Sequence, residues 1–186
     1  DREFSPTIAA ALAKLARKPL VIDVDDPEYA GDGSRLGDIE YDAWLSQAAP
    51  EFAQRIPADE WDAISLNYTS GTTGNPKGAL YSHRSTMLHT YSVCMPDGLS
   101  LSASDVVLPV GPLFHVNAWG IPFIVPMTGG KLVLPGRGAG DPATLVDLIN
   151  GERVTIALGV PTVWLALLQH LAATGARLPS LKRTVV

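Results

Sequence analysis

The sequence predicts an α/β protein with a mostly parallel sheet and helices on both faces of that sheet. Short runs of β-branched and aliphatic residues recur along the 186-residue chain, and they lack the strict alternation of a half-exposed strand. Stretches with the apolar spacing of helices lie between these runs. Because strands and helices alternate, we expect parallel pairing with right-handed crossovers.

The expected strands share a short, nearly continuous apolar composition, which is typical of strands buried on both faces. They lie at residues 19–23, 63–68, 105–110, 131–135, 154–158 and 184–186. The expected helices share a start signal, either a residue that can cap the first turn or a proline within that turn. They begin near Ser5, Ser82, Asp141 and Pro161, and the last two end at Gly151 and Gly175.

The composition is that of an ordinary globular protein, with 46% hydrophobic and 18% charged residues. A net charge of −5 argues against a nucleic-acid-binding surface, which needs clustered basic residues. The most apolar stretch, residues 119–125, is too short for a transmembrane segment. Cys94 is the only cysteine and the first residues lack a signal-peptide pattern, so we expect a reducing, cytoplasmic location.

The stretch YTSGTTGNPKG at residues 68–78 predicts a site for a polyphosphate. Its glycines let the backbone approach a ligand, and successive N–H groups in such a loop form an anion-binding concavity. Hydroxyl groups and one ammonium group add further donors. The pattern differs from a Walker A loop, because its lysine stands between proline and glycine. The candidate binding residues are Thr69, Ser70, Gly71, Thr72, Thr73, Gly74 and Lys77.

Residues 69–78 meet every fixed position of the pattern T-S-G-[ST]-T-G-x-P-K-G. The chain therefore resembles the acyl-adenylate-forming superfamily, which includes acyl-CoA synthetases, adenylation domains of peptide synthetases and luciferases. The resemblance implies that residues 1–186 are part of the large N-terminal AMP-binding domain, and that the rest of this domain and the C-terminal domain are absent. The chain starts without methionine and ends within a β-branched run, so we expect an excerpt of a longer protein.

A second motif, PLFHVNAWGIPF, occupies residues 112–123. His115 and Trp119 are four residues apart, so in a helix their side chains would share a face. The resemblance implies that His115 lies beside the carboxylate of the acid substrate and that Val116 lines the AMP site. It also implies that Trp119 closes the acyl tunnel until ATP binds, as in fatty acyl-CoA synthetases. The alternative is a histidine and a tryptophan that are simply packed within an apolar helix.

A third element follows the expected strand at residues 154–158. By the same resemblance, the turn formed by Gly159, Val160 and Pro161 borders the acyl pocket. Trp164, on the apolar face of the following helix, is more simply explained as a core residue.

The resemblance implies a ligase that works in two steps and uses ATP, Mg²⁺ and CoA. The carboxylate of an acid attacks the α-phosphate of ATP and releases pyrophosphate, and the acyl-AMP is then captured by a thiol, usually that of CoA. Thr69 is the expected Mg²⁺ ligand, and Lys77 and His115 are the expected catalytic residues. Because the family's later motifs are missing, we expect the isolated chain to make no acyl-AMP.

Several alternatives remain open at the level of sequence. The string F-H-V-N-A-W favours a medium- or long-chain fatty acid, and a short thioether acid such as methylthiopropionate is the close alternative. A non-catalytic nucleotide-binding fragment is a second class, and its last strand would then be free to pair with a second copy in a homodimer. A phosphate-loop NTPase is disfavoured by the position of the lysine.

Overall fold

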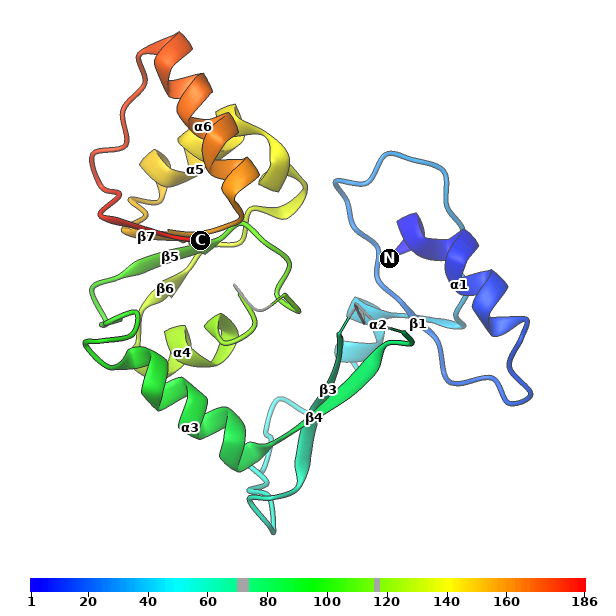
Figure 1. Cartoon of the computed structure of the whole chain (residues 1–186). Coiled ribbons are helices and arrows are strands. Elements are labelled where there is room, and N and C mark those ends of the chain that lie inside the picture. The colour runs from blue at the N-terminus through cyan, green and yellow to red at the C-terminus, as the bar shows by residue number, and fades with distance from the viewer. Residues whose placement is uncertain (70–73, 116–117) are drawn as a thin grey trace. The chain divides into compact units, whose positions relative to one another are not determined.

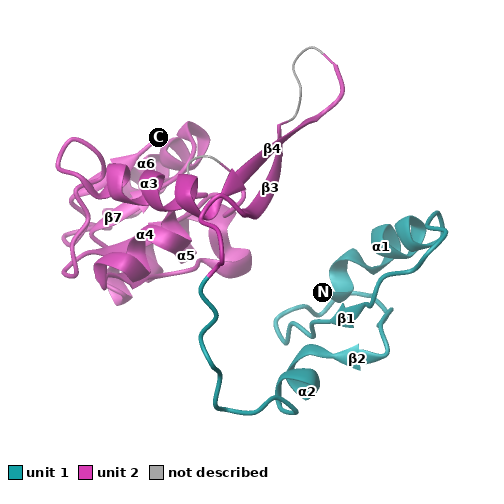
Figure 2. Cartoon of the chain, turned by 90° about the horizontal axis from the view of Figure 1, so that it is seen from below, with its two compact units in different colours: residues 1–56 teal, residues 57–186 magenta. Residues whose placement is uncertain are grey.

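The structure, a computed structural model, describes residues 1–69, 74–115 and 118–186. These residues form two compact units, Asp1–Ile56 and Pro57–Val186 (Figure 2). In the described part of the chain, every helix is too short or too polar to span a bilayer.

The first unit holds short elements around a two-stranded parallel sheet. Asp23 ends the first strand and is buried, with 6% of its surface exposed. Its carboxylate accepts hydrogen bonds from the backbone N–H of Leu36, at 3.0 Å, and of Gly37, at 2.7 Å. The elements are η1 (Arg2–Phe4), α1 (Ser5–Leu12), β1 (Ile22–Asp23), β2 (Ile39–Glu40) and α2 (Tyr41–Leu45).

The second unit begins with an antiparallel hairpin of β3 (Ala63–Thr69) and β4 (Lys77–Ser82). This corrects the expectation of a strand buried within a parallel sheet, because Leu66 and Leu80 pair across the hairpin and are 51% and 69% exposed. The connection at residues 70–76 is too short for a parallel crossover, which needs roughly a dozen residues or more.

The rest of the second unit contains the predicted parallel sheet. Its strands are β5 (Val106–Pro109), β6 (Lys131–Leu132), β7 (Ile156–Leu158) and β8 (Arg183–Val185). They follow the order β6-β5-β7-β8, and every neighbouring pair is parallel. The α/β architecture with a parallel sheet is therefore confirmed for this part of the chain.

Helices cover both faces of this sheet (Figure 1). One face packs against α4 (Ile121–Thr128) and the end of α3 (His83–Cys94). The other face packs against α5 (Pro142–Gly151) and α6 (Pro161–Thr174), with η2 (Gly136–Gly140) before them. Strand neighbours contribute alternately to the two faces, since Val107 belongs to the first cluster and Leu108 to the second.

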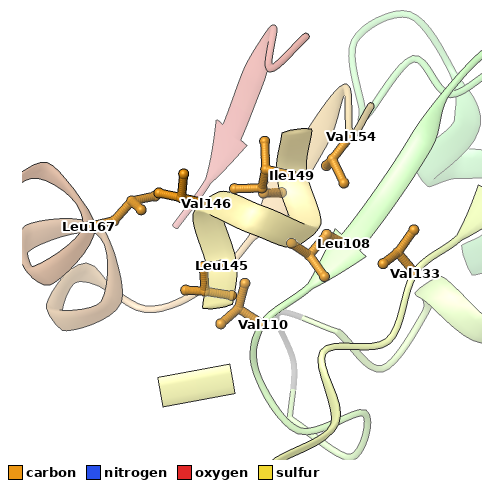
Figure 3. Packing of buried hydrophobic residues seen from close by; sticks show 9 residues of the cluster. Leu108, Val110, Val133, Leu145, Val146, Ile149, Val154 and Leu167 are labelled. Atoms are coloured by element: carbon orange, nitrogen blue, oxygen red, sulfur yellow. The ribbon is translucent and has the colours of Figure 1, made fainter. Parts of the chain in front are cut away.

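The larger of the two cores lies between the sheet and α5 and α6 (Figure 3). Leu108, Ile149 and Val154 have no exposed surface in it. Full burial of an aliphatic side chain contributes about 1.5 to 3 kcal/mol, so this core is the main source of stability for the sheet.

Most helix ends follow the predicted signals, but Ser5 does not cap α1: it is the first residue of that helix, and its hydroxyl accepts a hydrogen bond from the N–H of Ser34 at 3.1 Å. Ser82 caps α3 and accepts a hydrogen bond from the backbone N–H of Ser85 at 3.1 Å, within a capping box. Asp141 caps α5 by accepting a bond from the backbone N–H of Thr144 at 2.9 Å. Gly175 ends α6 with φ of 71°, a left-handed conformation that favours glycine.

A polar network fixes the amino ends of the central strands. Asp105 precedes β5 and is 7% exposed. Its carboxylate accepts hydrogen bonds from the Thr155 hydroxyl at 2.9 Å and the Ser102 N–H at 2.9 Å, and the Arg183 guanidinium lies 3.7 Å away. This end of the sheet is therefore occupied by structural interactions, whereas the candidate site gathers on the hairpin and beyond the carboxyl ends of β5 and β7.

Candidate functional site

A cavity of about 480 Å³ brings the first two sequence motifs together. One wall is the β3–β4 hairpin, and the other is the segment that follows β5. Its lining residues are Asn67, Tyr68, Thr69, Ala79, Tyr81, Phe114, His115 and Trp119.

The hairpin register places the candidate phosphate-binding residues next to each other. Thr69 pairs with Lys77 at the end of the hairpin, and Asn67 pairs with Ala79 further along. Because side chains alternate between the faces of a strand, these four residues share one face. Thr69 and Lys77 are both exposed, so the hydroxyl and the ammonium group are accessible to a ligand.

The connection between these strands contains the remaining residues of the motif. Gly74 has φ of 157°, and a Cβ at this position would meet no atom within 4 Å. Glycine is therefore favoured at this position by the backbone conformation, whereas a side chain would have enough space. The predicted binding residues Ser70, Gly71, Thr72 and Thr73 lie outside the described residues.

In the second motif, the described residues before Ile121 are joined by turn-type hydrogen bonds, where a regular helix was considered. The carbonyl of His115 accepts hydrogen bonds from the N–H of Ala118 at 2.9 Å and of Trp119 at 2.8 Å. The regular helix α4 begins only at Ile121. Pro122 explains this boundary, because it lacks the N–H that a continuous helix would need. His115 and Trp119 still line the same cavity, and Val116 lies outside the described residues.

Trp119 is held among three other rings. Its indole lies 4.5 Å from the ring of Tyr81, 5.4 Å from that of His89 and 6.0 Å from that of Phe123, measured between ring centroids. These contacts agree with the alternative of a packed tryptophan, and the packed ring also forms part of the cavity wall, as the substrate role would require.

A second cavity of about 260 Å³ lies beyond the carboxyl ends of β5 and β7. Gly159 and Val160 line it, whereas Pro161 begins α6 and is not among its lining residues. His115 lines both cavities and therefore stands between them. Trp164 packs over Gly159 and donates from Nε1 to the carbonyl of that residue at 3.2 Å, in agreement with a structural role.

The amino end of α3 is occupied by the chain itself. The N–H of His83 donates to the carbonyl of Asp62 at 3.1 Å, and the N–H of Arg84 donates to the carbonyl of Glu60 at 2.8 Å. The Arg84 side chain forms an ion pair with Glu60 and lies over the ring of Trp61, 5.3 Å from its centroid. These groups are therefore engaged within the protein.

The donor set of the hairpin suits a magnesium-bound phosphate. Among the described residues, no group of three histidine, cysteine, aspartate or glutamate side chains is arranged to hold a metal. Mg²⁺ prefers oxygen ligands and commonly keeps its waters and its phosphates, so one protein oxygen such as Thr69 Oγ1 is compatible with it. Lys77 beside Thr69 would add positive charge to the same place.

Sequence reasoning missed several residues of the cavity wall. Asn67, Ala79 and Tyr81 line the cavity and were not among the predicted site residues. A period of two along β4, counted from Lys77, leads to Ala79 and then Tyr81. That alternation was the available signal, because the segment between the motif and the helix at Ser82 was expected to be a strand or an extended turn, and it forms β4.

Residues 3–186 match the family described as AMP-binding enzyme. The chain belongs to the AMP-binding enzyme family. This membership confirms the resemblance that the motif at residues 69–78 indicated.

Two curated relatives are similar to this AMP-binding chain over its whole length. The medium-chain-fatty-acid–CoA ligase of Ectopseudomonas oleovorans is 47% identical over 186 residues, which cover 100% of this chain and 34% of the relative. The 3-methylmercaptopropionyl-CoA ligase of Ruegeria lacuscaerulensis is 56% identical over 187 aligned positions, with the same two coverages. The chain thus spans about a third of the length of these relatives.

A solved structure supports the same assignment for the fold of the AMP-binding chain. The crystal structure of the anthranilate CoA ligase AuaEII in complex with anthranoyl-AMP aligns with a TM-score of 0.79 and 26% identity. The alignment covers 97% of this chain and 33% of that protein.

Proposed function

We propose that the complete gene product containing this chain is an ATP-dependent acid–CoA ligase, which converts a carboxylic acid to acyl-AMP and then to acyl-CoA. The observation that carries this proposal is the cavity in which Thr69, at the edge of the phosphate motif, meets His115 and Trp119. Membership of the AMP-binding family and similarity to two named acid–CoA ligases support it.

The hairpin would offset negative charge in the first step, in which an anionic carboxylate must approach a polyphosphate. Lys77 would neutralise charge that develops on the phosphates, and Thr69 Oγ1 would hold Mg²⁺, which supplies further neutralisation when bound. The remaining loop residues would donate to the phosphate oxygens. They are Ser70, Gly71, Thr72, Thr73 and Gly74.

The segment after β5 would hold the acid. His115 would donate a hydrogen bond to the acid's carboxylate and keep it near the phosphate motif, since it lines the same cavity as Thr69. Trp119 would close the part of the cavity that receives the acyl chain. Val116 would line the AMP site, and the turn at Gly159, Val160 and Pro161 would border the acyl pocket.

The favoured substrate is a medium- or long-chain fatty acid, as the string F-H-V-N-A-W and the 47% identical medium-chain ligase suggest. A specific observation favours a second candidate, a short thioether acid. The 3-methylmercaptopropionyl-CoA ligase is 56% identical over the whole chain. Both candidates are aliphatic acids, so they differ mainly in the length of the cavity that they require.

Three further points belong to this proposal. The chain alone would make no acyl-AMP, since it spans about a third of its relatives. The single cysteine is consistent with the cytoplasm. A homodimer, which would be detected as self-association in solution, would need a pairing edge such as that of β8, at one end of the strand order.

The test is ATP–pyrophosphate exchange by the complete gene product with straight-chain acids from short to long and with 3-methylthiopropionate. We expect exchange that depends on one class of acid and that falls at least about 100-fold in Lys77→Ala, the scale for loss of one electrostatic group. Lys182→Ala is the matched control. This exposed lysine precedes β8 and therefore lies at the amino end of the parallel sheet, whereas the candidate site lies on the hairpin and beyond the carboxyl ends of the strands. Absence of exchange with every acid would instead favour a non-catalytic nucleotide-binding protein.

A further inference from the structure

We propose that Tyr81 is a positioning residue, which holds the Trp119 indole as an end wall of the larger cavity and thereby limits the length of the acid. The substrate part of this inference rests on the proposed ligase function. The positioning part rests only on the packing of described side chains.

Tyr81 makes the shortest of the ring contacts to Trp119. Their centroids are 4.5 Å apart with an interplanar angle of 36°, compared with 5.4 Å for His89 and 6.0 Å for Phe123. Both Tyr81 and Trp119 are half-buried and both line the cavity. The contact between them therefore forms a continuous aromatic section of the wall.

The indole also contacts α3, through the ring of His89 at 5.4 Å between centroids. A Cβ added to Gly120 would lie 2.9 Å from Nε2 of His89, so His89 packs closely against the backbone next to Trp119. A side chain at residue 120 would require the His89 ring to shift. Tyr81 from β4 and His89 from α3 thus restrict Trp119 from two different elements.

The hairpin also fixes where this wall stands relative to the phosphate motif. Lys77, Ala79 and Tyr81 are every second residue of β4 and therefore lie on one face of it, with Tyr81 four residues after Lys77. At the usual rise of a strand this separation is about 14 Å. Between these two residues β4 itself presents only the small side chain of Ala79 on this face, with Asn67 of β3 paired beside it, which leaves room for a ligand. An acid whose carboxylate lies near His115 would therefore extend its chain toward the Tyr81–Trp119 wall.

The expected size of the effect follows from the strength of aromatic pairs. Loss of one aromatic contact should lower the population of the conformation in which the Trp119 indole forms the cavity wall by about two- to tenfold. The added space for one more methylene changes discrimination by roughly tenfold or more in an apolar pocket. We therefore expect Tyr81→Ala to raise the ratio of octanoate- to butyrate-dependent exchange by about three- to tenfold.

The first experiment measures the position of Trp119 without any substrate. The complete gene product is labelled with 5-fluorotryptophan, and its fluorine NMR resonance for Trp119 is assigned with Trp119→Phe. We expect this resonance to shift or broaden in Tyr81→Ala and to stay close to the wild-type position in Tyr81→Phe, which keeps the ring. Leu80→Ala is the matched control, since Leu80 is the strand neighbour of Tyr81 and is 69% exposed. An unchanged resonance in Tyr81→Ala would overturn the positioning role.

The second experiment measures the ratio of octanoate to butyrate exchange in the same variants. The ratio should rise in Tyr81→Ala and stay within about twofold in Tyr81→Phe and Leu80→Ala. A shifted resonance with an unchanged ratio would overturn the role in acid length. If Tyr81→Ala does not fold, Tyr81→Leu removes the ring with less loss of volume and is held to the same outcomes.

Failure of this inference can be separated from failure of the proposed function. If the wild-type protein shows no exchange with any acid, the ligase proposal and the length-limiting role fail together, and the fluorine resonance still decides whether Tyr81 holds Trp119. If wild-type exchange is present and both readouts are unchanged by Tyr81→Ala, only the inference about Tyr81 fails.

Discussion

Replacing Asp105 by alanine should loosen the amino ends of β5 and β7 by about 2 to 3 kcal/mol. The carboxylate accepts hydrogen bonds from the Ser102 N–H at 2.9 Å, the Ser102 hydroxyl at 3.0 Å and the Thr155 hydroxyl at 2.9 Å. Each bond to a charged group contributes about 1 kcal/mol or more. Thr155 could compensate in part, because its hydroxyl also lies 3.3 Å from the carbonyl of Val106.

Hydrogen exchange followed by mass spectrometry would localise this effect in the complete gene product. Peptides that cover residues 101–110 and 154–158 should exchange about 30- to 150-fold faster in Asp105→Ala, the equivalent of 2 to 3 kcal/mol of local opening. Asp97→Ala, which alters an exposed aspartate before the same strand, should change these rates by less than about twofold. Unchanged exchange in Asp105→Ala would refute the structural role assigned to this network.

The same network predicts a dependence on pH. Burial acts to raise the pKa of Asp105, but the hydrogen bonds from Ser102 and Thr155 and the charge of Arg183 outweigh it and hold the pKa below its ordinary value of 3.8. Because the pKa is lower in the folded state, the stabilisation is complete above the unfolded pKa and is lost as pH falls through the folded value. The difference between wild type and Asp105→Ala should therefore be full at neutral pH and disappear at acid pH.

Three further substitutions test the packing. Ile149→Ala removes a side chain with no exposed surface and should lower the free energy of unfolding by about 2 to 5 kcal/mol, measured by urea denaturation. Gly175→Ala places a side chain at φ of 71° and should destabilise α6 by roughly 1 kcal/mol, seen as faster amide exchange at its end. Gly37→Ala would put a Cβ 2.2 Å from the carbonyl oxygen of Val21, so amide protection in β1 and β2 should be lost.

The features that were predictable from the sequence are those that depend on local chemistry. Ser82, Asp141 and Pro161 mark helix starts because the capping or proline signal acts within one turn. The apolar run at residues 154–158 indicated a buried strand, and β7 is buried within a parallel sheet. The run at residues 63–68 has a similar apolar content but lies in an exposed hairpin. Whether such a strand is buried depends on the elements that pack against it, and its own sequence does not specify those elements.

The candidate site was predictable in part for the same reason. The motif identified Thr69 and Lys77, and the hairpin register then placed them side by side. His115 and Trp119 were expected to share a face of a helix, and they line one cavity although both precede the regular helix α4. The contact of Trp119 with Tyr81 depends on how the hairpin meets the segment after β5, which no periodicity within either segment can show.

The order of elements after the phosphate motif determines how this chain can balance phosphate charge. In a Walker A loop the motif leads directly into a helix, whose first N–H groups face the phosphates. Here β4 lies between the motif and α3, and the N–H groups of His83, Arg84 and Ser85 donate to Asp62, Glu60 and Ser82. A phosphate held by the hairpin would thus receive little from the amino end of α3. Within this chain, the positive charge has to come from Lys77, from loop N–H groups and from a bound cation, and this is the physical reason for expecting Lys77→Ala to be so damaging.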